Sequence, residues 1–83
     1  MFHKVQEVYA LPDYRLRVLF AGGEMKIYDV RPLFGKWKAF LTLKGNPDLF
    51  SEVAVDVGGH GVVWNDDLDL SCDELFANGQ SLA

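Results

Sequence analysis

A cluster of carboxylates near the C-terminus is the first feature of this sequence that could do chemistry. It follows Asn65 and consists of Asp66, Asp67, Asp69, Asp73 and Glu74. Closely spaced carboxylates are typical of calcium loops, but an EF-hand loop that began at Asp67 would need glycine at its sixth position and glutamate at its twelfth. Those positions hold Cys72 and Asn78. The spacing excludes an EF-hand, and we expect no metal site.

The other reactive groups are one cysteine and two histidines. A cysteine nucleophile needs a neighbouring base, so Cys72 would have to meet His3 or His60 in the folded chain. A small, half-buried helix residue is the simpler interpretation of Cys72. No pair of carboxylates with opposed roles and no Ser–His–Asp order stands out. We therefore expect a protein that is not an enzyme, with no catalytic residues and no cofactor.

The segment Gly58-Gly59-His60-Gly61 raises the question of a phosphate-binding loop. A P-loop has a longer spacing and a Lys-Ser/Thr pair, and a dinucleotide fingerprint opens onto a helix. Here the glycines lie between two strand-like runs, so a turn between strands is the better explanation.

Length and composition indicate one domain over residues 1–83. The chain is 49% apolar and 24% charged, as in ordinary globular proteins. No run approaches the roughly 18–20 apolar residues that a membrane span needs. Lys4 and Glu7 interrupt the N-terminus where a signal peptide would be apolar. A lone cysteine fits a reducing compartment, so we expect a cytoplasmic protein without a membrane partner.

Charge divides the chain into two halves. Residues 1–44 contain all eight Lys and Arg residues and four carboxylates, a formal charge of +4, whereas residues 45–83 contain eight carboxylates and no Lys or Arg, −8. If the halves are not interleaved in the fold, they form electrically distinct surfaces. Direct binding of nucleic acid is not expected, because phosphate binding needs clustered cations. The acidic half either serves solubility alone or attracts a basic protein.

A β-hairpin is the most clearly predicted element. Residues 14–21 alternate between two faces of a strand. One face is apolar and carries Leu16, Val18 and Phe20, and the other carries Arg15, Arg17 and Leu19. A two-residue turn at Gly22-Gly23 would place Met25 and Ile27 on the apolar face. The same register places Arg17 opposite Tyr28 on the other face, where the two side chains could form a cation–π pair.

The remaining elements predict an α+β fold. Strands are expected over residues 5–10, 53–57 and 61–64, and short helical segments over residues 31–35, 36–44 and 46–52. An acidic loop follows at residues 65–69. Ser71 and Glu74 form a capping box for a last helix, which Asn78-Gly79 should end in a left-handed cap. The prediction is a small antiparallel sheet of about five strands, with an N-terminal hairpin, a C-terminal hairpin and a few short helices.

Several of these motifs together resemble the DUF2442 family of small bacterial domains of unknown function. They are Tyr14 to Phe20 leading to Gly23-Glu24, Tyr28-Asp29 with Arg31-Pro32-Leu33, Phe50 ahead of Val53 to Asp56, Gly61 to Trp64, and Asp69-Leu70 with Leu75-Phe76 and Gly79. The chain departs from the family pattern at Asp66-Asp67-Leu68, where a glycine usually precedes the Asp-Leu pair. The resemblance implies an α+β fold and no established catalytic residues.

The resemblance also suggests two functions. Some similar proteins are encoded beside a second small protein, as in toxin–antitoxin pairs, and others carry a helix-turn-helix domain. The first hypothesis is a non-catalytic protein-interaction module, antitoxin-like, that covers a small basic protein. The alternative is a small-molecule-binding or regulatory domain, and a self-associating domain is a third reading. We expect the partner-binding residues to be Asp66, Asp67, Asp69, Asp73 and Glu74, together with Arg17 and Tyr28.

Overall fold

The alternating residues of the N-terminal half form an antiparallel sheet. The computed structural model describes residues 3–81, and its first sheet contains four strands in the order β1 (Val5–Leu11), β2 (Arg15–Phe20), β3 (Met25–Asp29) and β7 (Gln80–Ser81). The predicted faces of β2 are confirmed, since Leu16, Val18 and Phe20 are buried. Strand β7 was not predicted, because it consists of two residues that pair only with β3.

The turn between β2 and β3 has three residues rather than two. Phe20 N donates to Glu24 O at 2.8 Å, and Gly23 N donates to Phe20 O at 2.9 Å. Gly23 has φ of 97°, whereas Gly22 is outside the left-handed region. A turn that ends in one left-handed glycine is the usual three-residue connection of a hairpin. The predicted register is therefore wrong by one residue.

This shift turns over every side chain of β3, because the side-chain period of a strand is two. Lys26 and Tyr28 lie on the inner face of the sheet, whereas Met25 and Ile27 lie on the outer face, with Ile27 paired to Arg17. The predicted Arg17–Tyr28 pair does not form, because these two side chains lie on opposite faces.

The C-terminal half forms a second sheet of three strands, β4 (Ala54–Val55), β5 (Gly61–Asn65) and β6 (Leu68–Ser71), in that order. β6 replaces much of the acidic loop predicted at residues 65–69. Leu68 and Leu70 are buried and alternate with the exposed Asp69, which is the pattern of a strand with one buried face. Only Asp66 and Asp67 remain as the turn between β5 and β6.

Short helices connect the strands. They are the 3-10 helices η1 (Pro12–Tyr14), η2 (Arg31–Gly35), η3 (Lys38–Thr42) and η4 (Val57–Gly59), and the α-helices α1 (Pro47–Phe50) and α2 (Cys72–Asn78). Both predicted N-caps are present: Asn46 Oδ1 accepts from Leu49 N at 3.3 Å, and Ser71 Oγ accepts from Glu74 N at 3.1 Å. The Glu74 carboxylate binds Tyr28 and Asn78. Of the predicted capping box, only the bond from Glu74 N to Ser71 Oγ is therefore formed.

The end of α2 differs from the prediction. Gly79 has φ of −73°, so it is not a left-handed cap. A Cβ atom at this position would lie 2.5 Å from the Leu75 carbonyl oxygen and 3.1 Å from the Lys26 Cβ. The close approach of α2 to β3 is what requires glycine here.

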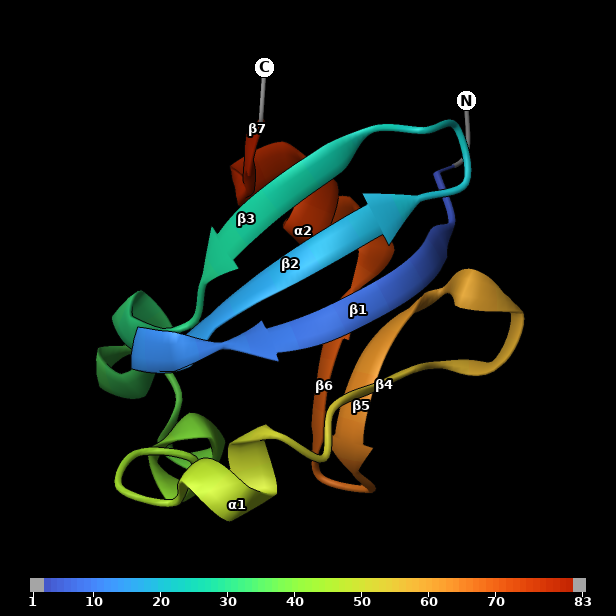
Figure 1. The fold of residues 1–83 in the computed structure, drawn as a ribbon. Helices are drawn as coiled ribbons and strands as arrows, with labels where there is room; N and C mark the ends of the chain where they lie inside the picture. Colours follow the sequence, from blue (N-terminus) through green and yellow to red (C-terminus); the bar gives the residue numbers. More distant parts are fainter. Residues whose placement is uncertain (1–2, 82–83) are drawn as a thin grey trace.

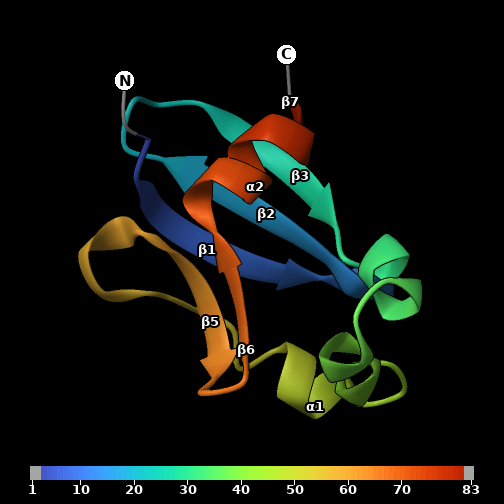
Figure 2. The same ribbon diagram turned by 180° about the vertical axis from the view of Figure 1, so that it is seen from behind.

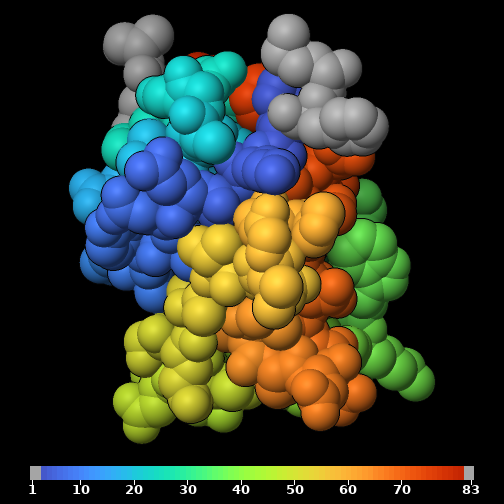
Figure 3. All heavy atoms as spheres, turned by 90° about the vertical axis from the view of Figure 1, so that its right-hand side faces the viewer, coloured from blue at the N-terminus to red at the C-terminus, as the bar shows by residue number. Residues whose placement is uncertain are grey.

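The core lies between the first sheet, α2 and the second sheet. Figures 1 and 2 show α2 across one face of β2 and β3, with β5 and β6 beside it. In Figure 3 the turn around residues 57–60 rests on the N-terminal strand, and Gly59 has no room for a Cβ, which would lie 2.8 Å from the Val5 carbonyl oxygen. The indole N–H of Trp64 donates to the Phe50 carbonyl at 3.0 Å, which ties the second sheet to α1.

Within residues 3–81, no helix is long and apolar enough to cross a membrane.

The two faces of the first sheet should respond differently to the same substitution. We expect Val18→Asp to destabilise the protein by roughly 3 kcal/mol or more, because it buries an unpaired charge. Ile27→Asp, on the neighbouring strand but on the outer face, should cost only about 1 kcal/mol. Thermal unfolding followed by circular dichroism measures both. Equal destabilisation by the two variants would mean that the outer face is buried.

Candidate functional site

The outer face of the first sheet, which points away from α2, is the most distinctive surface of the described chain. No element of residues 3–81 covers it: β1, β2 and β3 lie at the front in Figure 1, and α2 lies behind them. Strand pairing aligns three rows of side chains on this face, Glu7–Leu19–Met25, Tyr9–Arg17–Ile27 and Leu11–Arg15–Asp29. These nine residues are called the outer face below.

The outer face is more apolar than a solvated sheet face usually is. An antiparallel sheet with one face in water normally presents polar side chains there. Here four of the nine side chains are aliphatic or thioether, namely Leu11, Leu19, Met25 and Ile27, and all four are partly buried. Tyr9 adds an aromatic ring that is 44% exposed. Apolar side chains gathered on an uncovered sheet face are a feature of interaction sites.

Arg17 stands at the centre of the outer face. Its guanidinium carbon lies 4.7 Å from the centroid of the Tyr9 ring, within the range of a cation–π contact. Its Nε atom is inaccessible to solvent and makes no hydrogen bond with any described residue. Buried donors are nearly always paired in folded proteins, so an unpaired one indicates a missing partner or a functional role.

The two carboxylates of the outer face are already engaged. Tyr9 OH donates to Glu7, which raises the pKa of the Tyr9 phenol. Arg31 binds Asp29 with its NH2 group at 2.7 Å and its Nε at 2.9 Å, and these bonds lower the pKa of the Asp29 carboxyl. Among residues 3–81 this is the sole ion pair, so Arg15 and Arg17 form none, although the charge of Arg15 contributes to the lowered pKa of Asp29.

Tyr28, predicted as a partner-binding residue, is instead part of the core. It is 3% exposed and faces α2, where its hydroxyl donates to Glu74 Oε2 at 2.7 Å. Burial and the contact with Glu74 raise the pKa of the Tyr28 phenol. The neighbouring inner residue, Lys26, donates from Nζ to the Phe76 carbonyl at 2.5 Å. These contacts fasten α2 to β3.

The predicted acidic surface is divided between two ends of β6. Asp66, Asp67 and Asp69 are exposed on the β5–β6 hairpin, which is called the acidic hairpin below. Asp73 and Glu74 lie at the start of α2, at the opposite end of β6 (Figure 2). Because α2 and β7 pack on the first sheet, the two halves of the chain are partly interleaved. The acidic surface is therefore smaller than the charge pattern of residues 45–83 predicts.

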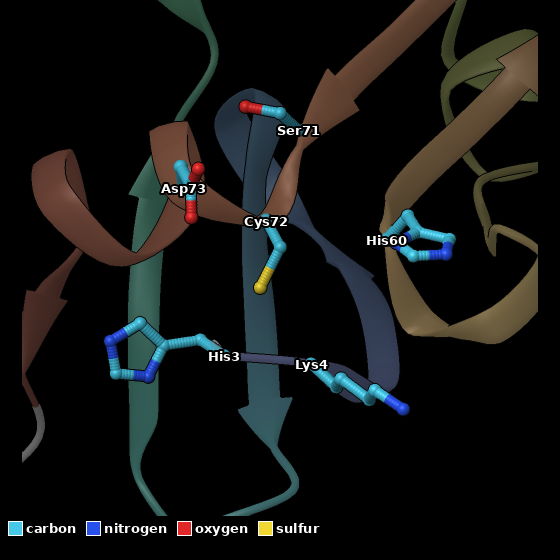
Figure 4. Close-up of a pocket in the computed structure, with 6 residues that line it drawn as sticks. All are labelled: His3, Lys4, His60, Ser71, Cys72 and Asp73. Atoms are coloured by element: carbon cyan, nitrogen blue, oxygen red, sulfur yellow. The ribbon is translucent and has the colours of Figure 1, made fainter. Parts of the chain in front are cut away.

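Cys72 and both histidines line a pocket of about 410 Å³, in which their side chains point in different directions (Figure 4). It is lined by His3, Lys4, His60, Ser71, Cys72 and Asp73. Burial raises the pKa of the Cys72 thiol, and the charge of Asp73 raises it further, contrary to the small decrease that a helix start would give. The His3 ring stacks on Phe76 at a centroid distance of 3.5 Å. A protonated thiol is a poor nucleophile, so this arrangement does not favour cysteine catalysis.

Within residues 3–81, no group of three or more His, Cys, Asp or Glu side chains is arranged to hold a metal ion.

Comparison with protein families matches residues 5–81 to the model described as "Protein of unknown function (DUF2442)". The chain belongs to the DUF2442 family. Among solved structures, the domain resembles the crystal structure described as "Putative DNA Binding Protein NE0471" from Nitrosomonas europaea, with 28% identity and a TM-score of 0.80. The match covers 94% of this chain and 49% of the other, so the domain spans about half of that protein. The comparison with curated proteins gave no match.

The structure of the DUF2442 domain thus unites only part of the predicted site. Arg17 lies on the outer face, Asp66, Asp67 and Asp69 lie on the acidic hairpin, and Tyr28 and Glu74 bind each other inside. The prediction missed Tyr9, Met25 and Ile27. A three-residue turn at Ala21-Gly22-Gly23, had it been considered, would have placed Met25 and Ile27 beside Arg17.

The two tyrosines should differ in their effect on stability. We expect Tyr28→Phe to cost about 0.5–1.5 kcal/mol at neutral pH, because it removes a part-buried hydrogen bond to Glu74. The folded-state pKa of Tyr28 is raised, so its contribution is complete below about pH 10 and falls at higher pH. Tyr9→Phe, at an exposed site, is the matched control and should be nearly neutral. Denaturant unfolding at pH 7 and above pH 10 measures both variants. If neither Tyr28→Phe nor Tyr9→Phe changes the free energy of unfolding, the hydrogen bond from Tyr28 to Glu74 does not stabilise the fold.

Proposed function

We propose that this DUF2442 domain is a non-catalytic protein-interaction module and that the outer face is its binding surface. One observation carries the proposal: an uncovered sheet face holds partly buried apolar side chains around an arginine whose Nε lacks a partner. Water is a poor solvent for such a surface, and its burial would be favourable. The inner face already packs on α2, so a partner element on the outer face would complete a third layer.

The partner of this module is proposed to be another small protein. The acidic hairpin projects Asp66, Asp67 and Asp69 into solvent, where they would speed encounter with a protein of positive net charge. An antitoxin-like role, in which the domain covers a small basic protein encoded next to it, is the specific form of this proposal. The single, buried Cys72 suits the reducing cytoplasm as the place of this interaction.

A regulatory domain attached to a DNA-binding unit is the second candidate. It is favoured by the Nitrosomonas europaea protein, which is described as a "Putative DNA Binding Protein" and is about twice as long as the part that this chain matches. In this arrangement the DUF2442 domain would bind a regulator, and the other half would contact DNA. The two candidates differ in what the isolated domain binds.

The test is the affinity of the purified chain for the protein encoded next to it, measured by calorimetry. We expect Ile27→Asp, on the outer face, to weaken binding by about tenfold or more, since it places a charge in a desolvated contact. Val57→Asp is the matched control, because Val57 is 86% exposed and lies on η4, outside the outer face.

Three other results would count against this proposal. Equal weakening by the two variants would show that the outer face is not the contact. Loss of binding only when Asp66 and Asp67 are changed to Asn would move the contact to the acidic hairpin. No binding by the parent chain would leave the regulatory candidate as the better explanation.

A further inference from the structure

We propose that Arg17 is a carboxylate-binding residue and that the element seated on the outer face is an amphipathic helix with an acidic residue in its apolar stripe. This inference rests on the proposed function, because it assigns the chemistry of the partner that the outer face binds. It concerns a second protein, rather than a second copy of this chain.

Arg17 presents an unpaired donor to the proposed partner. The arginine side chain offers donors in a fixed fork, and Nε together with one terminal nitrogen can bind both oxygens of a carboxylate. In the free domain, Nε is sequestered beside the Tyr9 ring and donates to no described residue. The cost of that unpaired donor is removed when an acceptor arrives. A carboxylate would reach Nε only if the exposed Tyr9 side chain moved away from the guanidinium.

The charges around Arg17 also favour a carboxylate ligand. Of the two carboxylates on the outer face, Asp29 is paired with Arg31, which lies just beyond β3, and Glu7 accepts from the neutral Tyr9 hydroxyl. Arg15 and Arg17 are the cations of the central strand, and neither forms an ion pair with a described residue. Strand β2 runs through the middle of the sheet, so Arg17 lies between Tyr9 and Ile27, whereas Arg15 lies between Leu11 and Asp29. A surface with these properties selects a ligand that is apolar with a central carboxylate.

The width of the outer face fits an α-helix. Strands lie about 4.8 Å apart, so the three strands of the outer face span roughly 10 Å, and this is close to the diameter of an α-helix. The inner face of the same sheet already receives a helix, α2. An extended peptide would instead pair with the backbone of an edge strand. The outer face therefore fits a helix laid across it.

The experiment uses the full chain and two synthetic amphipathic peptides of about 15 residues, long enough to form a helix. Both carry a leucine stripe; one has Glu at its centre and the other has Gln. Calorimetry gives the two dissociation constants, and the ¹⁵N–¹H signal of Arg17 Nε reports the contact directly. We expect the Glu peptide to bind about tenfold more tightly than the Gln peptide and to shift the Arg17 Nε signal.

Two variants of Arg17 make the test specific. Arg17→Gln should reduce the affinity ratio of the two peptides to about one, and Arg17→Lys should restore only part of it, because lysine keeps the charge but lacks the fork. Both variants should melt near the parent temperature, since Arg17 is on the open face. An affinity ratio that survives in Arg17→Gln would overturn the assignment of the carboxylate to Arg17.

The remaining outcomes separate this inference from the proposed function. If both peptides bind the parent equally and Ile27→Asp abolishes both, the outer face is a binding surface but Arg17 is not its carboxylate receptor. If neither peptide binds, the helix is the wrong occupant. If sedimentation shows a dimer that Ile27→Asp dissociates, the occupant is a second copy, and the inference is also overturned.

Discussion

The three-residue turn between β2 and β3 determines what each face of the first sheet can do. Gly23 adopts φ of 97° at its end, and this places Lys26 and Tyr28 on the side of α2. A turn one residue shorter would exchange the two faces of β3, because side chains alternate along a strand. Tyr28 would then lose Glu74, and Met25 and Ile27 would point into the core. Both the packing of α2 and the character of the outer face depend on this single register.

The same register links stability to binding. On the inner side, Leu16 and Val18 are fully buried, and Tyr28 anchors α2 through Glu74. The glycine at position 79 then lets the chain pass close to Lys26 and form β7 beside β3. The stability of the domain comes from this side. The outer face contributes little to the core, so its apolar residues and Arg17 are free to serve a partner.

The sequence predicts the elements of this fold better than their pairing. The faces of β2, the N-caps at Asn46 and Ser71 and the α+β class follow from local periodicity and capping chemistry, and they are confirmed. The register was missed because two adjacent glycines suit either of two turn lengths. β6 was missed because its carboxylates obscured the alternation of Leu68 and Leu70, and β7 because only tertiary packing defines it. The composition of the outer face depends on the register, so Arg17 is the one residue of that face that the sequence interpretation named.

The central claim is that the sheet has one closed face and one open face that a partner covers. Solvent paramagnetic relaxation of methyl groups, measured by NMR on the free chain and again with the protein encoded next to it, tests this most directly. The account predicts strong relaxation of Met25 and Ile27 and little of Val18 in the free chain, and protection of Met25 and Ile27 in the complex. Two results would contradict it. One is that the Met25 and Ile27 methyl groups are as shielded as those of Val18 in the free chain; the other is that their solvent relaxation does not fall in the complex.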